Sequence, residues 1–225
     1  TDLIKVMTGI RRCGKSVMLE LIKQELTASG ISPSQFISIN FEDMNYFHLQ
    51  TAKALHDEIT KKAMTINGKV YLFFDEIQEA PRGLTALKYF QEKAPQYHVV
   101  AAGSLLGIAM HSNDSFPVGK VDFMDLYPLS FSEFLEAVGQ EAFARLLAKK
   151  DWGLIAAFRS KLIDLLKQYY YVGGMPEVVN AFINHKDYAE VRQLQQTILD
   201  SYDRDFSKHA PIAEVPRIRM IWRSV

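Results

Sequence analysis

The chain has few of the features that mark metal-cluster or disulfide-stabilised proteins. It holds one cysteine, Cys13, which excludes an internal disulfide and a cysteine zinc cluster and fits a reducing cytosol. Its six histidines occur singly, with no pair at helical spacing, so a structural zinc site has no support. These shortages predict a cytoplasmic protein without a disulfide or a zinc site.

Long apolar runs and an excess of one charge are also missing. The longest nearly apolar run, residues 99–110, is interrupted by small residues and is too short to span a bilayer, so we expect no membrane partner. The 26 Lys and Arg residues balance 26 Asp and Glu, so no overall field favours nucleic acid or anionic lipid. The chain begins at Thr1 without a methionine and ends in the periodic run 217–225, and we expect it to be a piece of a longer protein.

In the first half, short apolar runs alternate with longer amphipathic ones, which is typical of a parallel sheet flanked by helices. The expected strands are residues 3–8, 36–41, 70–74, 98–102 and 121–126, and the expected helices are residues 15–28, 51–64 and 84–93. The run 70–74 is wholly apolar, as in a central strand, whereas 121–126 alternates more and is expected nearer an edge. The pattern predicts an α/β fold.

After Pro128 the pattern becomes helical, with no strand of comparable strength. The expected helices are residues 131–138, 142–148, 154–170 and 188–202. We therefore predict two parts, a core over residues 1–128 and a helical region over residues 129–225. The aromatic run 169–171 follows an apolar helix, so we expect it in the core rather than as a stacking platform for single-stranded nucleic acid.

A glycine-bounded segment follows the first expected strand and opens the first expected helix. It matches the Walker A pattern G-x-x-x-x-G-K-[ST] at every fixed position. The glycines let successive backbone N–H groups point at phosphate oxygens, and the helix adds its positive N-terminal end. Lys15 would reach the β and γ phosphates, and the Ser16 hydroxyl would ligate Mg²⁺. The expected nucleotide-binding residues are Gly9, Ile10, Arg11, Arg12, Cys13, Gly14, Lys15, Ser16 and Val17.

Three residues inside this segment have open roles. Arg11 and Arg12 could contact phosphate, but a solvated pair beside an anionic ligand is the better interpretation. Cys13 is either a small loop residue, which we favour, or an oxidation-sensitive thiol near a helix N-terminus.

The apolar run 70–74 ends in two acids, Asp75 and Glu76, in the manner of a Walker B segment. In a doubly wound sheet, ligands lie beyond the carboxyl ends of the strands, where these carboxylates would fall. Asp75 suits Mg²⁺ coordination, directly or through water, and Glu76 suits polarising a water for attack on the γ-phosphate. Acidic loop residues are common after strands, but Asp75 lies sixty residues after Lys15. This spacing leaves room for one strand and two helices and favours the functional interpretation.

Polar residues also follow two other expected strands. Ser104 could sense the γ-phosphate or orient the attacking water, or it could cap the next helix, and both roles stay open. We place Ser104 with Glu76 and Lys15 in the expected catalytic set. Glu42 and Asp43 could approach the same edge of the sheet, although a solvated or capping role fits them slightly better.

Together these stretches resemble the AAA-type branch of P-loop ATPases, and more narrowly a prokaryotic family whose AAA domain precedes a C-terminal domain of unknown function. The resemblance is carried by residues 7–16, 72–78 and 101–104 and, more specifically for the family, by 126–134 and 173–177. It implies an ASCE-type core with Glu76 as the catalytic glutamate and Ser104 at the first-sensor position. It also implies a helical lid from about Ser130 onward, followed by a separate domain beyond this chain.

The chain departs from the family at one position that bears on catalysis. Members often have Gly-Arg before the last core strand, where this chain has Gly119 and Lys120. Lysine lacks the planar fork of arginine, so Lys120 is a poor transition-state finger. Three arginines of the helical part could take this role instead, and the sequence does not choose between them: Arg159, Arg192 and Arg204. Gly173 and Gly174 are expected to form a tight packing turn of the lid rather than a nucleotide contact.

These features predict a Mg²⁺-dependent ATP hydrolase of the AAA type, with ATP and ADP as ligands, that couples hydrolysis to movement of the lid or an attached domain. One alternative is a regulatory switch that hydrolyses nucleotide slowly. The other is a nucleic-acid-associated ATPase, suggested by AAA relatives and the mildly basic residues 204–225. Self-association into a homo-oligomer and the identity of any protein or DNA partner stay open.

Overall fold

The computed structural model of the protein describes residues 3–49, 51–80, 83–103, 121–210, 213–222 and 224, with the backbone alone for residues 83–85 and 206–209. The chain divides into two compact units, Thr1–Tyr127 and Pro128–Val225. Each unit has a hydrophobic core of its own. In the part of the chain described, no helix is both long enough and apolar enough to cross a membrane.

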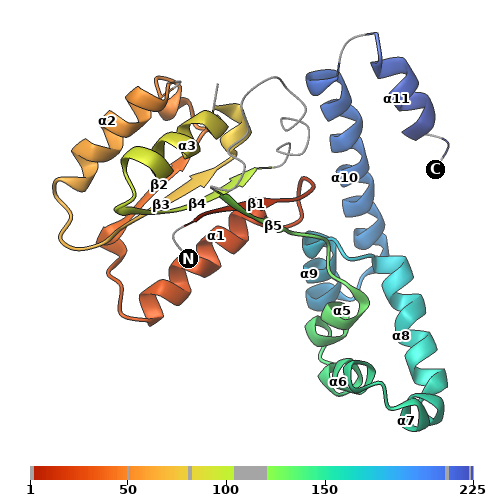
Figure 1. The fold of residues 1–225 in the computed structure, drawn as a ribbon. Helices are drawn as coiled ribbons and strands as arrows, with labels where there is room; N and C mark the ends of the chain where they lie inside the picture. Colours follow the sequence, from red (N-terminus) through yellow and green to blue (C-terminus); the bar gives the residue numbers. More distant parts are fainter. Residues whose placement is uncertain are drawn as a thin grey trace. The chain divides into compact units, whose positions relative to one another are not determined.

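The first unit is a five-stranded parallel sheet with helices on both faces (Figure 1). Its strands are β1 (Ile4–Thr8), β2 (Phe36–Asn40), β3 (Val70–Asp75), β4 (Tyr97–Gly103) and β5 (Val121–Asp125), in the spatial order β2-β3-β4-β1-β5. The expected α/β class is confirmed, and each expected strand lies within one residue of an observed one. The apolar strand β3 is interior and β5 is at an edge, as its alternation predicted.

Among the residues that the structure describes, three helices cover this sheet, and three short 3₁₀ turns join the elements. The helices are α1 (Lys15–Ala28), α2 (Ala52–Ala63) and α3 (Gly83–Lys93), and the turns are η1 (Pro33–Gln35), η2 (Met44–Tyr46) and η3 (Ile77–Glu79). Helix α1 lies on one face and α2 and α3 on the other (Figure 1). Successive side chains of a strand point to opposite faces, so Leu72 and Phe74 pack with α2 and α3, while Phe73 packs with α1. A strand covered on both faces therefore needs an unbroken apolar run.

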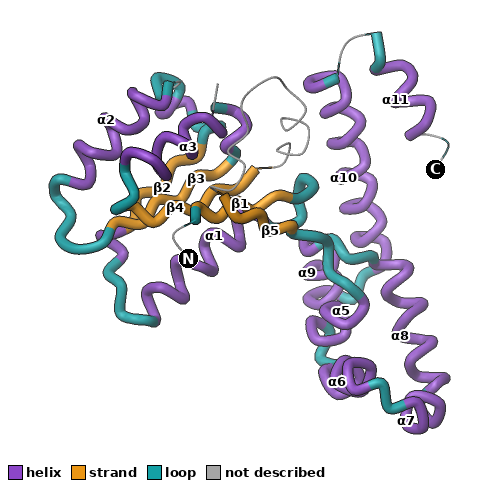
Figure 2. The backbone as a smooth tube through the Cα atoms, in the orientation of Figure 1, coloured by secondary structure: helices purple, strands orange, loops and turns teal. Residues whose placement is uncertain are grey.

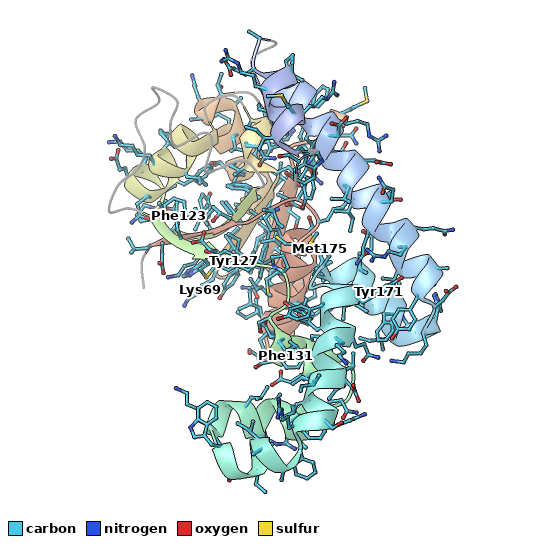
Figure 3. All side chains as sticks on the ribbon, turned by 90° about the vertical axis from the view of Figure 1, so that its right-hand side faces the viewer. Lys69, Phe123, Tyr127, Phe131, Tyr171 and Met175 are labelled. Carbon is cyan, nitrogen blue, oxygen red and sulfur yellow. The ribbon has the colours of Figure 1, made fainter. Side chains whose placement is uncertain are left out.

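The second unit is helical, as Figure 2 shows by the purple of its elements. Its helices are α5 (Phe131–Ala137), α6 (Glu141–Lys149), α7 (Trp152–Ala157), α8 (Arg159–Val172), α9 (Pro176–His185), α10 (Tyr188–His209) and α11 (Val215–Trp222). The core is built around Phe134, Val178, Val179 and Phe182, which are each at most 2% exposed. Phe131 and Met175, labelled in Figure 3, pack against this core.

Three expectations about these helices were wrong. The single helix expected over 154–170 is two helices, which meet at Phe158, whose φ of −98° and ψ of 16° end α7 and precede α8. Helices α9 and α11 were not expected, although the sequence of α9 carries the signal of a proline at the first helical position. Helix α10 continues seven residues beyond the expected end at residue 202.

The connection between the units is fixed at both of its ends. In the first unit, the Leu126 amide donates to the Thr8 carbonyl at 2.7 Å. In the second unit, the Leu129 amide donates to the Gly174 carbonyl at 2.7 Å, and the Tyr169 hydroxyl donates to the Leu129 carbonyl at 2.8 Å. A Cβ placed on Gly174 would lie 2.2 Å from the Leu129 carbonyl oxygen, so only glycine fits there. This close approach supports the expected packing role of Gly174.

The three consecutive tyrosines have different surroundings. Tyr169 packs against the helical core, as expected, whereas Tyr170 and Tyr171 are exposed, so the core expectation was wrong for these two. Tyr171, at the end of α8 in Figure 3, is at the surface, with the Arg192 guanidinium carbon 4.4 Å from its ring centroid. This stacking gives Arg192 a structural contact within its own unit.

Candidate functional site

The glycine-bounded segment leaves the carboxyl end of β1 and turns into α1. Arg12 and Gly14 have left-handed backbones, with φ of 63° and 97°, which reverse the chain before the helix. A Cβ placed on Gly9 would lie 2.3 Å from the Leu126 carbonyl oxygen and 2.8 Å from the Cys13 sulfur, so glycine is required there by space. The first N–H groups of a helix have no acceptor within it, so this end of α1 offers donors and a positive dipole end to an anion.

The Lys15 side chain folds into this turn and is 5% exposed. Its ammonium donates to the Gly9 carbonyl at 3.0 Å and to the Ile10 carbonyl at 2.8 Å. Phosphate oxygens are stronger acceptors for an ammonium than neutral carbonyls are. The lysine is therefore held in the segment predicted to bind phosphate, by contacts that a phosphate could replace.

Cys13 lies beside this ammonium and is 3% exposed, with the sulfur 4.0 Å from Lys15 Nζ. Burial raises the pKa of the Cys13 thiol above its ordinary value, while the nearby Lys15 charge acts in the opposite direction. A thiol with a raised pKa is a weak nucleophile, because the thiolate is the reactive form. This supports the interpretation of Cys13 as a small loop residue rather than a reactive one.

A cavity of about 300 Å³ adjoins the segment on the α1 side of the sheet. Ser16 and Asp75 both line it, together with Asn40 at the end of β2, which is paired in register with Asp75. Hydroxyl, carboxylate and amide oxygens are the donors that Mg²⁺ takes in proteins. The structure thus brings the two residues predicted to hold Mg²⁺ to one cavity and adds Asn40, which the sequence analysis did not single out.

The two acids after β3 form a tight local arrangement. The Glu76 amide donates to Asp75 Oδ1 at 3.0 Å. Glu76 has φ of 49° and ψ of 46°, a left-handed conformation that is uncommon for residues other than glycine. The Gln78 side-chain amide donates to Glu76 Oε2. Gln78 lies in the stretch 72–78 that carries the family resemblance, but sequence reasoning gave it no role, because its contact depends on the left-handed turn at Glu76.

The acids after β2 separate into two roles. Glu42 Oε1 accepts from Arg11 Nη2 at 3.0 Å, which ties this carboxylate to the phosphate-loop segment. Asp43 instead caps η2, because its Oδ1 accepts from the Asn45 amide at 2.9 Å. The capping expectation is confirmed for Asp43, and Arg11 pairs with an acid rather than being only solvated.

Several predicted residues are not part of this arrangement. Ser104, Gly119 and Lys120 lie outside the described residues. The arginines considered as substitutes for Lys120 all belong to the second unit, and their role stays a prediction. Across the described ranges, no group of three or more His, Cys, Asp or Glu residues could hold a metal ion.

Comparison with known families gives two matches along the chain. Residues 1–135, more than half of the chain, match a family model described as an AAA domain. Residues 163–225 match a second model, described as a domain of unknown function. The second match lies within the helical unit.

Two relatives come from a bacterium and an archaeon. An uncharacterized protein of Haemophilus influenzae is 30% identical over 181 residues, which is 80% of this chain and 41% of the relative. An uncharacterized protein of Methanocaldococcus jannaschii is 27% identical over 176 residues, which is 78% of this chain and 36% of the relative. The chain thus spans less than half the length of either relative.

Two solved structures align with this chain, both with low structural similarity. The Caenorhabditis elegans PCH-2 structure aligns with a TM-score of 0.42 at 13% identity, over 65% of this chain and 40% of that one. The Aeropyrum pernix ORC1 protein, solved in complex with DNA, aligns with a TM-score of 0.44 at 12% identity, over 93% of this chain and 63% of that one. Similarities of this size add nothing to a functional argument.

Proposed function

The chain belongs to the AAA domain family, as its sequence motifs indicated, and from that premise we propose that it is a Mg²⁺-dependent ATP hydrolase. One observation carries the proposal. The Lys15 ammonium is buried in a glycine-bounded turn, next to a cavity that Ser16 and Asp75 line together. A buried cation, helix N-terminal amides and oxygen ligands at one place are what a triphosphate with its metal requires.

The phosphate tail binds to the segment 9–17 in this proposal. The amides at the start of α1 donate to phosphate oxygens, and Lys15 exchanges its two carbonyl partners for the β and γ phosphates. Arg11 stays paired with Glu42, so it stabilises the segment and does not contact the ligand. ADP, which keeps the β phosphate, remains a ligand of the same segment.

The metal site is proposed from the chemistry of its donors. Ser16 and Asp75 would hold Mg²⁺, and Asn40, which lines the same cavity, would offer a further oxygen donor. The bound ion would offset the negative charge of the triphosphate. Ser16 is therefore proposed to serve both the nucleotide and the metal.

The hydrolytic step is assigned to Glu76. Its carboxylate accepts a proton from a water whose oxygen forms a bond to the γ phosphorus, while the bond from that phosphorus to the bridging oxygen breaks. ADP leaves with the electron pair of the broken bond, and Lys15 stabilises the charge that develops on the phosphates. Ser104 is kept as a second candidate for orienting this water.

The coupling of hydrolysis to the helical unit is a further part of the proposal. It is supported by the connection between the units, because its first end is bonded to Thr8, directly before the phosphate segment. The proposal concerns this site alone. It does not extend to self-association, to a partner, or to the parts of the longer relatives that this chain does not match. We place the protein in the cytoplasm on the basis of its single buried thiol.

The test is Mg²⁺-ATP titration and phosphate release on the full-length protein, with two variants and a control. Lys15→Ala should weaken ATP binding roughly tenfold to a hundredfold, because it removes charge-assisted hydrogen bonds. Glu76→Gln should keep ATP affinity and lower turnover by about a hundredfold or more. Lys167→Ala, an exposed lysine of α8, should change neither quantity.

The same measurements separate the alternatives. Unchanged turnover in Glu76→Gln would remove this residue from the mechanism. Wild-type turnover below about 0.01 s⁻¹, even with candidate partners, would favour a slow regulatory switch. Loss of ATP binding in the lysine control as well would mean that the Lys15→Ala result reports general damage.

A further inference from the structure

We infer that Gln78 is a positioning residue that holds the Glu76 carboxylate in the orientation needed to accept a proton from water. The inference rests on the proposed hydrolase function and extends it to a residue that no motif assigned. Its starting observation is the hydrogen bond from the Gln78 side-chain amide to Glu76 Oε2. The two residues lie on one turn, immediately after the strand that carries Asp75.

The turn that presents Gln78 is anchored in the core. Ile77, between the two partners, is 1% exposed and belongs to the core under α2 and α3. The turn is closed by two backbone hydrogen bonds, from the Glu79 amide to the Glu76 carbonyl at 2.9 Å and from the Ala80 amide to the Ile77 carbonyl at 3.2 Å. A buried anchor and a closed turn fix where the Gln78 side chain begins.

Glu76 is fixed from its backbone side as well. Its amide donates to Asp75 Oδ1 at 3.0 Å, its backbone is left-handed, and its side chain accepts from Gln78. Such a conformation costs free energy for a residue with a Cβ, and functional sites are where it is retained. The carboxylate of Glu76 is thus restrained by Asp75 through the main chain and by Gln78 through the side chain.

The chemistry of an amide suits this task. Gln78 donates a hydrogen bond to one carboxylate oxygen, and because a carboxylate has about four acceptor sites, Glu76 can also accept from a water. An amide does not take up the proton that Glu76 must receive, so it orients the base without competing with it. A glutamate side chain has three rotatable bonds, and holding it in one orientation removes an entropic cost from the reaction.

The test uses the full-length protein and measures ATP turnover and Mg²⁺-ATP affinity. Gln78→Ala removes the donor, and Gln78→Glu keeps the size but replaces the donor with a second carboxylate. We expect kcat to fall about tenfold for Gln78→Ala and further for Gln78→Glu, with affinity for Mg²⁺-ATP within about twofold of wild type. The matched control is Gln196→Ala, which removes a 2.8 Å bond from a glutamine amide to Asp200 in the second unit and should leave turnover unchanged.

A double-mutant cycle separates positioning from a merely structural role. In a Glu76→Gln background, single-turnover measurements should show less than about a twofold further loss from Gln78→Ala, because the carboxylate to be positioned is gone. An equal loss in both backgrounds, or a loss of Mg²⁺-ATP affinity in place of kcat, would overturn the inference.

Failure of the inference and failure of the proposed function give different results. If Glu76→Gln is inactive but both Gln78 variants turn over ATP at the wild-type rate, hydrolysis stands and the role of Gln78 does not. If the wild-type protein binds Mg²⁺-ATP and releases no phosphate, the proposed function fails and this inference falls with it. Melting temperatures of the variants show that each comparison is made on folded protein.

Discussion

Three residues of the phosphate segment are held by close contacts with neighbouring protein atoms. Gly9 has no space for a side chain, and Lys15 is enclosed by the carbonyls that its ammonium contacts. Cys13 is close to both residues. Its sulfur lies 2.8 Å from the position that a Cβ on Gly9 would take and 4.0 Å from Lys15 Nζ. A change at any of the three is therefore expected to alter the shape of the segment.

The raised pKa of the Cys13 thiol predicts slow alkylation of the native protein. Above its ordinary pKa a thiol is mostly thiolate, but burial keeps the Cys13 thiol protonated to higher pH. At pH 8 we expect iodoacetamide to modify native Cys13 at least about tenfold more slowly than the denatured chain, as followed by mass spectrometry. Cysteine in a short peptide is the control, and a native rate equal to the denatured one would contradict the burial.

Much of the candidate site follows from local patterns. The phosphate segment and the two acids after β3 are contiguous stretches whose chemistry is visible without a fold. The Arg11–Glu42 pair is different, because it joins residues 31 positions apart, and such a contact is set by tertiary geometry that a single sequence does not contain. The bond from Gln78 to Glu76 is local, but it depends on the left-handed turn at Glu76, which the residue types there do not predict.

Among the secondary-structure elements, α5 begins with a complete capping box. The Ser130 amide donates to Glu133 Oε2 at 2.7 Å, and the Glu133 amide donates to the Ser130 hydroxyl at 3.4 Å. The pKa of the Glu133 carboxyl is lowered by the Ser130 backbone hydrogen bond and then by the Ser130 hydroxyl. Both ends of the box therefore stabilise the first helical turn after the connection.

This capping box predicts a pH-dependent contribution to stability. Because the folded pKa of Glu133 lies below its unfolded pKa, the stabilisation is present above the unfolded value and is lost as the pH falls through the folded value. Glu133→Gln should lower the free energy of unfolding at pH 7, and the difference from wild type should shrink toward pH 3. Ser130→Ala should cost about 1 kcal/mol at neutral pH.

Urea unfolding at several pH values measures both effects. Glu136→Gln on the same helix is the control, because it changes an exposed glutamate outside the box. A pH-independent difference between Glu133→Gln and wild type would contradict the ionic part of the explanation. Equal stability of Ser130→Ala and wild type would contradict the cap itself.

Elements were predictable where burial dictated their residues. Strand β3 is covered on both faces, so its apolar run fixed its position to within one residue. The break at Phe158 was not predictable, because apolar residues continue at helical spacing through it. There the Phe158 ring packs against the Phe143 ring of α6 in a T-shaped arrangement, with the ring centroids 5.6 Å apart. This tertiary contact accompanies the break.

For the whole molecule, two separate cores predict separable effects on stability and binding. Phe134 is fully buried among Tyr169 and Phe182, so Phe134→Ala should destabilise the helical unit by about 3–5 kcal/mol. ATP affinity should stay within about twofold of wild type, because the phosphate segment belongs to the other unit. Calorimetry and nucleotide titration on the same samples test both statements.

The exposed Tyr170 provides the control for this core substitution. Tyr170→Ala removes an aromatic side chain of similar size from the surface of the same unit and should change stability by less than about 0.5 kcal/mol. If Phe134→Ala lowered ATP affinity as strongly as it lowered stability, the two cores would not be energetically separate.

The anchored connection limits how the two units can move. Only Tyr127 and Pro128 lie between its bonded ends at Leu126 and Leu129, and three residue steps of about 3.4 Å span roughly 10 Å at most. Proline holds its own φ near a single value, so few backbone torsions remain adjustable in this short connection. While both ends stay bonded, Leu126 and Leu129 cannot separate by more than this length, whatever conformation Tyr127 and Pro128 adopt.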